Sequence, residues 1–258
     1  MYDKICKTCG GDCVVVKEDD NGYTLRCTCC DNVYTFAKEK APVVNATPVS
    51  QKKDAGERVF ETCIDSVMEL TCRAGNNCYA GSGFAVGNNG YAVTNTHVVT
   101  ENGRPVDEVK AYVCGKTVPA QIIALGDDRG GSGAGEDLAL IRLTGAPAKM
   151  KGVTFSEEPV RNGQKLYVIG NALGMGTCIT NGIISDKRRM VNGKPRLMTD
   201  CAANHGNSGG PVFDEDGRVI GAIVAGIDSA KGMNFAIPAD VIEDFLEKCR
   251  MADGTLRI

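Results

Sequence analysis

The sequence predicts an all-β protein with a small cysteine-rich module at its N-terminus and a helix near its C-terminus. Short apolar segments recur along most of the chain, separated by turn dipeptides such as Asn192-Gly193 and Asp216-Gly217, a pattern typical of barrels and sandwiches. Its 258 residues include 32 glycines, and 43% are hydrophobic, which suits a folded protein with many turns. Two close cysteine pairs lie near the N-terminus. Together these observations predict one metal-stabilised module and one larger β domain.

The N-terminal module, residues 1–37, contains the pairs Cys6-x-x-Cys9 and Cys27-x-x-Cys30. Two such pairs separated by about 15–20 residues form a tetrahedral site of four sulfur ligands, and this ligand set favours zinc over iron. Segments 14–16, 23–25 and 33–36 are predicted strands, so we expect a zinc ribbon. A module this small lacks a large core and would depend on bound metal for its stability.

Two cysteines of this module are surplus to the predicted metal site. We interpret Cys13 as a small buried residue and Cys29 as an exposed turn thiol. Cys29 also stays an alternative to Cys30 as the fourth ligand, although Cys-x-Cys is the less usual ligand spacing.

The cysteine content also led to a prediction about location. The chain has 13 cysteines, and an odd number with two Cys-x-x-Cys pairs fits poorly with a secreted disulfide framework. Residues 1–10 are polar, where a signal peptide requires an apolar core. No apolar run reaches the length of a membrane span. We therefore expect a cytoplasmic protein with reduced thiols and no membrane partner.

A flexible linker is predicted over residues 38–55, where prolines and charged residues replace any apolar period. The larger domain then covers 56–258. A glycine-rich insertion over 126–135 lacks the Gly-Lys-Ser/Thr ending of a phosphate-binding loop, so we interpret it as a mobile surface loop. Apolar periodicity predicts helices over 56–65 and 238–248. Alternation and turn signals predict strands over roughly 66–72, 79–86, 91–95, 108–113, 118–125, 138–143, 165–169, 177–185, 195–200, 211–213, 218–225 and 233–237.

The most informative motif is Gly206-Asn207-Ser208-Gly209-Gly210-Pro211. Glycine costs conformational entropy, so three glycines around one serine require a backbone reason. An exposed nucleophile supplies one, because the N–H groups of Gly206 and Ser208 can point at one spot and form an oxyanion hole. The alternative is a glycine-rich turn with an incidental serine.

Two upstream segments favour the nucleophile. His97 ends the apolar strand pattern before it, and Asp137 opens the apolar run over 138–141. A serine nucleophile requires a base to take its proton, and the base requires a carboxylate to hold its tautomer. The chain order His97, Asp137, Ser208 is that of chymotrypsin-type enzymes.

At these motifs the chain resembles the trypsin-fold serine proteases, and most closely their HtrA/Deg branch. The resemblance covers about residues 56–249 and extends to segments 81–84, 90–95, 169–171, 199–200 and 234–238. It implies two six-stranded Greek-key barrels, with His97 and Asp137 in the first, Ser208 in the second and the site between them. Only nine residues follow Cys249, so we expect no PDZ module.

The resemblance also implies a substrate pocket and a mode of activation. Ala202 lies where trypsin-like enzymes hold an acid at the pocket floor, and Gly226 and Gly232 would line its walls. We therefore expect cleavage after small or medium uncharged side chains. Asn207 stands where trypsin-like zymogens have an aspartate that pairs with a new amino terminus, so we expect activity without chain cleavage. Order in loops 171–177 and 203–207 must then come from another source, such as substrate or a partner.

Two function hypotheses stay open. The first is a serine endopeptidase that acts on protein or peptide substrates and whose zinc ribbon recruits a partner protein or substrate. The second is a zinc-ribbon scaffold or binding protein whose protease fold has little or regulated activity. An esterase with the same residues is a weaker third. The net charge of −3 gives no general attraction to nucleic acid, although the ribbon leaves such a partner open. A homo-oligomer is also open, because HtrA-like proteins are often trimers.

Overall fold

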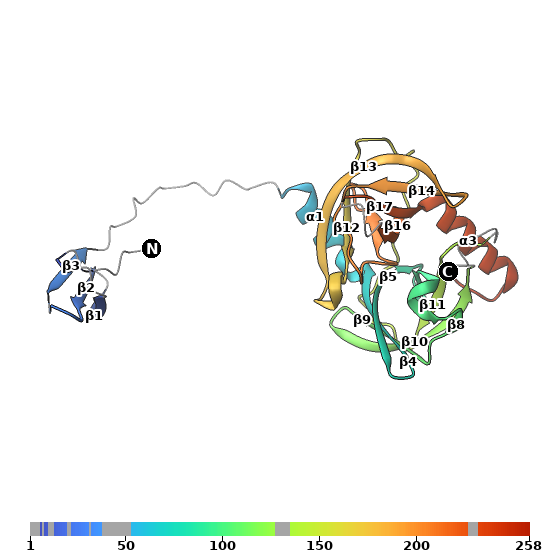
Figure 1. Cartoon of the computed structure of the whole chain (residues 1–258). Helices are drawn as coiled ribbons and strands as arrows, with labels where there is room; N and C mark the ends of the chain where they lie inside the picture. Colours follow the sequence, from blue (N-terminus) through green and yellow to red (C-terminus); the bar gives the residue numbers. More distant parts are fainter. Residues whose placement is uncertain are drawn as a thin grey trace. The chain divides into compact units, whose positions relative to one another are not determined.

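The structure is a computed structural model and describes residues 6, 8–9, 13–19, 22–30, 32–37, 53–126, 135–226 and 232–258. The chain divides into two compact units, Met1–Lys52 and Lys53–Ile258 (Figure 1). The predicted linker up to residue 52, and positions 127–134 of the predicted glycine-rich loop, lie outside the described residues.

The first unit contains a three-stranded antiparallel sheet of order β1-β2-β3. Its strands are β1 (Cys13–Asp19), β2 (Gly22–Cys27) and β3 (Val33–Ala37), close to the predicted segments. Its buried cluster consists of Leu25 and three cysteines, with Tyr34 packed against it. Cys13 is buried and Cys29 is exposed, as expected. So few apolar side chains give the sheet little stability of its own.

The second unit begins with helix α1 (Ala55–Cys63). Asp54 caps it: its carboxylate accepts the Glu57 N–H at 2.8 Å, and the Glu57 carboxylate accepts the Asp54 N–H at 3.2 Å. This reciprocal pair is a capping box and satisfies two backbone donors at the helix start. The helix is shorter than predicted, because residues Ile64–Ser66 continue as a 3₁₀ turn that leads into the first barrel strand.

The first barrel is closed, with strand order β10-β11-β6-β5-β4-β9. Strands β4, β5 and β6 pair in sequence order, and β9 returns by a long connection to pair with β4, which makes a Greek key. A small hairpin, which the sequence did not predict, pairs β7 (Thr100–Glu101) with β8 (Arg104–Pro105). The barrel strands are β4 (Val67–Ala74), β5 (Asn77–Val86), β6 (Tyr91–Thr94), β9 (Glu108–Val113), β10 (Lys116–Leu125) and β11 (Ala139–Leu143).

The second barrel is also closed, with order β12-β13-β14-β17-β16-β15, and α3 (Ala239–Ala252) follows it and packs beside β16 (Figure 1). Strand β13 is longer than predicted because it continues to a tight turn at Asn192-Gly193, where both residues have positive φ. Its strands are β12 (Lys165–Gly170), β13 (Cys178–Val191), β14 (Lys194–Thr199), β15 (Pro211–Phe213), β16 (Val219–Gly226) and β17 (Asn234–Pro238). The prediction of an all-β protein with two six-stranded barrels and a C-terminal helix is confirmed.

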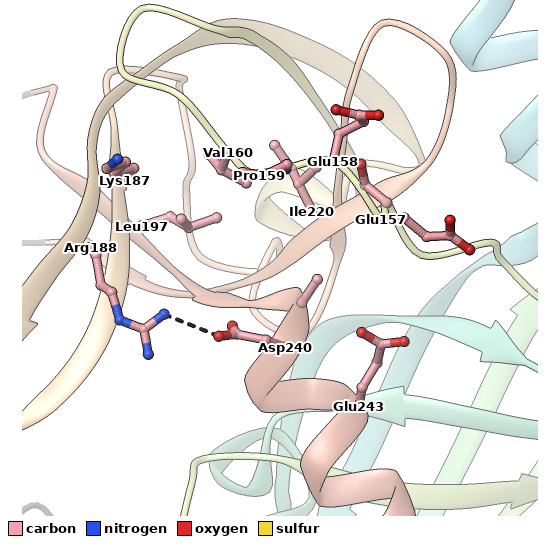
Figure 2. A pocket seen from close by; sticks show the side chains of 12 residues that line it. Glu157, Glu158, Pro159, Val160, Lys187, Arg188, Leu197, Ile220, Asp240 and Glu243 are labelled. Carbon is pink, nitrogen blue, oxygen red and sulfur yellow. Dashed lines mark hydrogen bonds and ion pairs between the residues drawn. The ribbon is translucent and has the colours of Figure 1, made fainter.

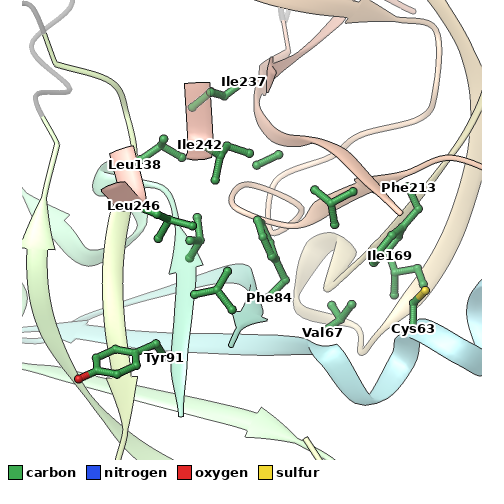
Figure 3. Close-up of a cluster of buried hydrophobic side chains, with 14 of the residues drawn as sticks. Cys63, Val67, Phe84, Tyr91, Leu138, Ile169, Phe213, Ile237, Ile242 and Leu246 are labelled. Atoms are coloured by element: carbon green, nitrogen blue, oxygen red, sulfur yellow. The ribbon is translucent and has the colours of Figure 1, made fainter. Parts of the chain in front are cut away.

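Three hydrophobic clusters hold this unit together. Each barrel has its own interior cluster. A third contains Phe84 of the first barrel, Ile169 and Phe213 of the second, and Ile242 and Leu246 of α3 (Figure 3). Because this cluster shares side chains from both barrels, burial of apolar area stabilises their contact as well as each barrel. The residues at their junction are thereby held in a fixed arrangement.

Candidate active site

His97 and Asp137 meet at one end of the first barrel. Strands β6 and β11 are antiparallel neighbours, with Thr94 opposite Ala139, so the residues just after Thr94 and just before Ala139 lie at the same end. Asp137 Oδ2 lies 2.6 Å from His97 Nδ1, and Asp137 Oδ1 accepts the His97 backbone N–H at 3.0 Å. The His97 side chain is 43% exposed and that of Asp137 15%. The carboxylate therefore fixes one ring nitrogen and leaves the other accessible.

The backbone around His97 differs from the prediction. His97 does not end a strand but lies in a short helical turn, α2 (Thr96–Val99). Two buried side chains tie this turn to the segment of Asp137: Asn95 Nδ2 donates to the Asp137 carbonyl and Thr96 Oγ1 to that of Leu138, both at 2.7 Å. No role was expected for these two residues, although polar side chains beside a strand end are a signal for such anchors.

Ser208 lies in the connection between β14 and β15 and is partly buried. Its carbonyl accepts the Ser82 N–H at 2.9 Å, which ties the second barrel to β5 of the first. Gly209 follows with φ of +82°, and a Cβ there would lie 2.4 Å from the Ser82 carbonyl oxygen, so only glycine fits. Ser208 Oγ makes no hydrogen bond to His97 or to any other described residue. Catalytic hydrogen bonds in substrate-free enzymes often form only with substrate bound.

The peptide between His205 and Gly206 has a defined orientation. The His205 carbonyl accepts the Leu173 N–H at 2.6 Å. Carbonyl and N–H point in opposite directions in a trans peptide, so the Gly206 N–H points away from Leu173. Among the described residues, neither this N–H nor that of Ser208 has an acceptor. Two free backbone donors on either side of Asn207 are the arrangement that stabilises an oxyanion.

The residues predicted to form the substrate pocket are only partly described. Ala202 and Gly232 are exposed, Gly226 ends β16, and residues 227–231 between the two glycines are outside the described chain. Thr180 lies beside Ala202, whose carbonyl accepts the Thr180 hydroxyl at 3.0 Å. Thr180 belongs to β13 and was not expected in this region. His205 is exposed at the same loop.

Two cavities lie elsewhere. One, of about 490 Å³, has a floor that includes Leu197 and Ile220 and a rim that includes Glu157 and Glu243 (Figure 2). Burial is the main cause that raises the pKa of Glu243, and the negative charges of nearby carboxylates raise it further. The other, of about 420 Å³, is lined in part by Glu69 and residues of β9. His97, Asp137 and Ser208 line neither cavity, so cavity size does not locate the candidate site.

The four cysteines predicted as ligands come together in the first unit. Their sulfur atoms all lie within 4.8 Å of one another, with Cys6 and Cys30 3.6 Å apart and Cys9 and Cys27 3.5 Å apart. A tetrahedral site with zinc–sulfur bonds of about 2.3 Å places its sulfurs about 3.8 Å apart. Cys30, not Cys29, completes the group. The cluster therefore fits a metal ion of this size and ligand preference.

Hydrogen bonds favour the thiolate form of two of these ligands. The Tyr34 hydroxyl lies 3.1 Å from Cys6 Sγ and, against the effect of burial, lowers the pKa of Cys6 to about 5. The Cys29 backbone N–H donates to Cys27 Sγ at 3.3 Å and lowers the pKa of Cys27. Burial instead raises the pKa of Cys13. Metals bind thiolates, so the first two groups are prepared for coordination.

Comparison with known proteins agrees with this architecture. Residues 81–221, more than half of the chain, match the trypsin-like peptidase domain family. A probable periplasmic serine endoprotease, DegP-like, from Brucella suis is 33% identical over 193 residues, covering 69% of this chain and 35% of that protein. The chloroplastic Protease Do-like 1 of Arabidopsis thaliana is 30% identical over 181 residues, covering 66% and 39%. The chain thus spans about a third of the length of these relatives.

Solved structures show the same fold. The HtrA-type protease AlgW, solved with a tripeptide, superposes with a TM-score of 0.65 at 27% identity, covering 74% of this chain and 62% of that one. A serine endoprotease from Yersinia pestis gives a TM-score of 0.66 at 24% identity, covering 77% and 67%.

The predicted cytoplasmic location is wrong, because the relatives are named periplasmic or chloroplastic. Cysteine content is a poor guide to location here for a physical reason. Four thiols gather in a group that could hold a metal ion, and others, including Cys63, Cys72, Cys201 and Cys249, are buried, where cysteine packs as a small apolar residue. Such thiols say little about the redox compartment. No helix among the described residues combines the length and apolar character that crossing a bilayer requires.

Fold, family match and relatives agree: the chain belongs to the trypsin-like peptidase family, with homologues among the HtrA- and DegP-type serine endoproteases.

Proposed function

We propose that the chain is a serine endopeptidase that uses His97, Asp137 and Ser208. Ser208 Oγ attacks the peptide carbonyl, and His97 takes its proton and later donates it to the leaving amine. Asp137 holds the His97 ring in the required tautomer. The N–H groups of Gly206 and Ser208 stabilise the oxyanion that forms. These steps require no cofactor.

The observation that carries this proposal is the 2.6 Å contact between His97 Nδ1 and Asp137 Oδ2 in the first barrel. The Ser82 N–H of the same barrel donates to the Ser208 carbonyl and so ties the serine to this barrel. A carboxylate held against one nitrogen orients the other toward a nucleophile. The two free N–H donors beside Ser208 add the second requirement of acyl transfer. The relatives' names, serine endoprotease and protease, support the same reaction.

A fluorophosphonate probe and an unfolded casein substrate test the proposal. We expect the probe to label intact protein at Ser208 and the casein to be cut. Ser208→Ala should lose both, with a loss of several orders of magnitude in rate, while Ser185→Ala on β13 serves as the matched control. Labelling and cleavage that survive in Ser208→Ala would contradict this mechanism. A wild-type protein that neither labels nor cleaves would favour the scaffold hypothesis.

We further propose a preference for small or medium uncharged side chains before the cut. The support is the side chain of Ala202, which carries no charge to pair with a substrate arginine or lysine. Burying such a cation without a partner is costly. A peptide library analysed by mass spectrometry tests the preference, and cleavage chiefly after arginine or lysine would refute it.

For the first unit, we propose a structural zinc held by Cys6, Cys9, Cys27 and Cys30, and a role in recruiting a partner protein or substrate. The sulfur spacings and the N–H donors to Cys6 and Cys27 support the metal, and zinc would supply folding energy to a sheet with little core. Metal analysis of protein purified without chelators should find about one zinc per chain. Crosslinking with and without residues 1–37 then tests recruitment.

Two further proposals follow from the relatives. Their names support action outside the cytoplasm, which fractionation of the native protein would test. Self-association, common among HtrA-type proteins, is a second proposal, and light scattering of the purified chain measures it directly.

A further inference from the structure

We propose that Glu69 is a positioning residue that orders the oxyanion hole, by holding the loop over residues 171–177 to the first barrel. The inference deepens the proposed function and rests on it. Glu69 lies on β4, in a different barrel from Ser208, and it carries no part of the proposed chemistry. Its effect passes through the loop to the peptide that presents the Gly206 N–H.

The contact is made at Thr177, where one carboxylate oxygen of Glu69 accepts two hydrogen bonds. Glu69 Oε1 accepts the Thr177 backbone N–H at 2.8 Å and the Thr177 hydroxyl at 2.7 Å. Both residues are partly buried. Hydrogen bonds to an ionised acceptor are stronger than neutral ones, so this pair fixes the C-terminal end of the loop.

The other end of the loop is held by the strand neighbour of Glu69. Ser82 lies directly opposite Glu69 in the β4–β5 pairing. Ser82 Oγ accepts the Asn171 N–H at 2.9 Å and donates to the Gly206 carbonyl at 2.7 Å. Two adjacent residues of the first barrel therefore hold both ends of a loop that belongs to the second.

The middle of the loop has little packing to hold it. Leu173 is 61% exposed and Met175 84% exposed, and Leu173 has a φ of +56°, which is unusual for a side chain of its size. An internal bond from the Gly176 N–H to Asn171 Oδ1, at 2.9 Å, closes it. Its order therefore depends on its end contacts rather than on burial.

The loop in turn sets the oxyanion hole. The Leu173 N–H holds the His205 carbonyl, and the same peptide carries the Gly206 N–H on its opposite side. If residue 173 shifts, the peptide is free to rotate and the N–H leaves the hole. Asn207 cannot form the ion pair with a freed amino terminus that orders this region in trypsin-like enzymes. The contacts of Glu69 and Ser82 order the loop from within the chain instead.

The test compares wild type with E69A, E69Q and a control, E108A, which removes a carboxylate on β9 that pairs with Lys110. Three quantities are measured: kcat and KM on a peptide substrate, inhibition by a peptide boronate whose tetrahedral adduct occupies the oxyanion hole, and hydrogen exchange of residues 171–177. Exchange reports loop order whether or not the protein hydrolyses anything.

We expect E69A to lower kcat by about ten- to a hundred-fold and to change KM by less than about threefold. This loss in kcat is no larger than the loss caused by removing one oxyanion donor outright. Boronate affinity should fall in parallel, and exchange should accelerate in 171–177 but not in β16. E69Q keeps a carbonyl oxygen for Thr177 but loses the charge that strengthens both bonds, so its kcat and its loop exchange should lie between those of wild type and E69A. E108A should stay within about threefold of wild type.

Wild-type exchange of residues 171–177 in E69A would overturn the inference, and so would faster exchange spread evenly over both barrels. A wild-type protein that neither labels nor hydrolyses would refute the proposed function instead, and exchange would still decide whether Glu69 orders the loop.

Discussion

Replacing Gly206 by alanine tests the geometry of the proposed oxyanion hole most directly. Gly206 has a φ of +94°, and a Cβ at this position would lie 2.1 Å from the Asn171 carbonyl oxygen and 3.2 Å from the Leu173 nitrogen. Gly193, in the turn between β13 and β14, provides a matched control. Its φ is +76°, and a Cβ there meets nothing within 4 Å.

The two variants share one cost and differ in another. A non-glycine residue at positive φ costs about 1–2 kcal/mol, which lowers Tm by about 2–4 °C per kcal/mol in a domain of this size. Only Gly206→Ala adds a clash, and relieving it needs a shift of roughly 1 Å, from 2.1 Å to beyond 3.0 Å. A displacement of about 1 Å costs about a hundred-fold in rate. Complete loss of one oxyanion donor costs about 10²–10³ in kcat.

Steady-state peptide hydrolysis gives kcat and KM of both variants, and thermal unfolding gives their Tm. We expect Gly193→Ala to lose stability only, with kcat near wild type. Gly206→Ala should lose about 10²–10³ in kcat, with KM nearly unchanged because the donor acts mainly on the transition state. If the two variants have the same kcat within about threefold, the peptide of Gly206 does not serve the reaction and the reasoning is refuted.

Three other predictions follow from the site and the first unit. Asn207 is 1% exposed and its Oδ1 has no partner among the described atoms, so Asn207→Asp buries an unpaired charge. We expect the free energy of unfolding to fall by about 3–5 kcal/mol and fluorophosphonate to label the uncleaved chain more slowly. Wild-type values of both would contradict this. Ala202→Asp should move cleavage toward arginine and lysine in a peptide library, because the new carboxylate can pair with the cation, whereas an unchanged cleavage profile would place the pocket floor elsewhere. Chelation of the metal should abolish the circular dichroism of isolated residues 1–37 while the Tm of the larger unit stays constant, and a shift in that Tm would show that the two units are coupled.

The sequence by itself determined the parts of this protein that depend on residue type and local spacing. Two Cys-x-x-Cys pairs specify four converging sulfurs, because each pair is a short turn with little conformational freedom. Regular turn signals and alternating apolar residues predicted most strands of both barrels. The motif around Ser208 predicted a backbone that only glycine can follow, and the structure has Gly206 and Gly209 at positive φ with no room for a side chain.

Tertiary structure decided what depends on contacts between distant segments. Glu69 and Thr177 are 108 residues apart, and nothing in the local pattern of either predicts their bond. The helical turn of His97 likewise depends on bonds from Asn95 and Thr96 to the segment of Asp137, which lies beside it only because β11 pairs with β6. Local pattern specifies which residues alternate, cap or turn, but the orientation of the peptide before Gly206 is set by which barrel strand the loop of Leu173 meets. That meeting exists only when the barrels pack, because a hydrogen bond between separated segments forms only after the chain entropy of bringing them together has been offset by burial elsewhere.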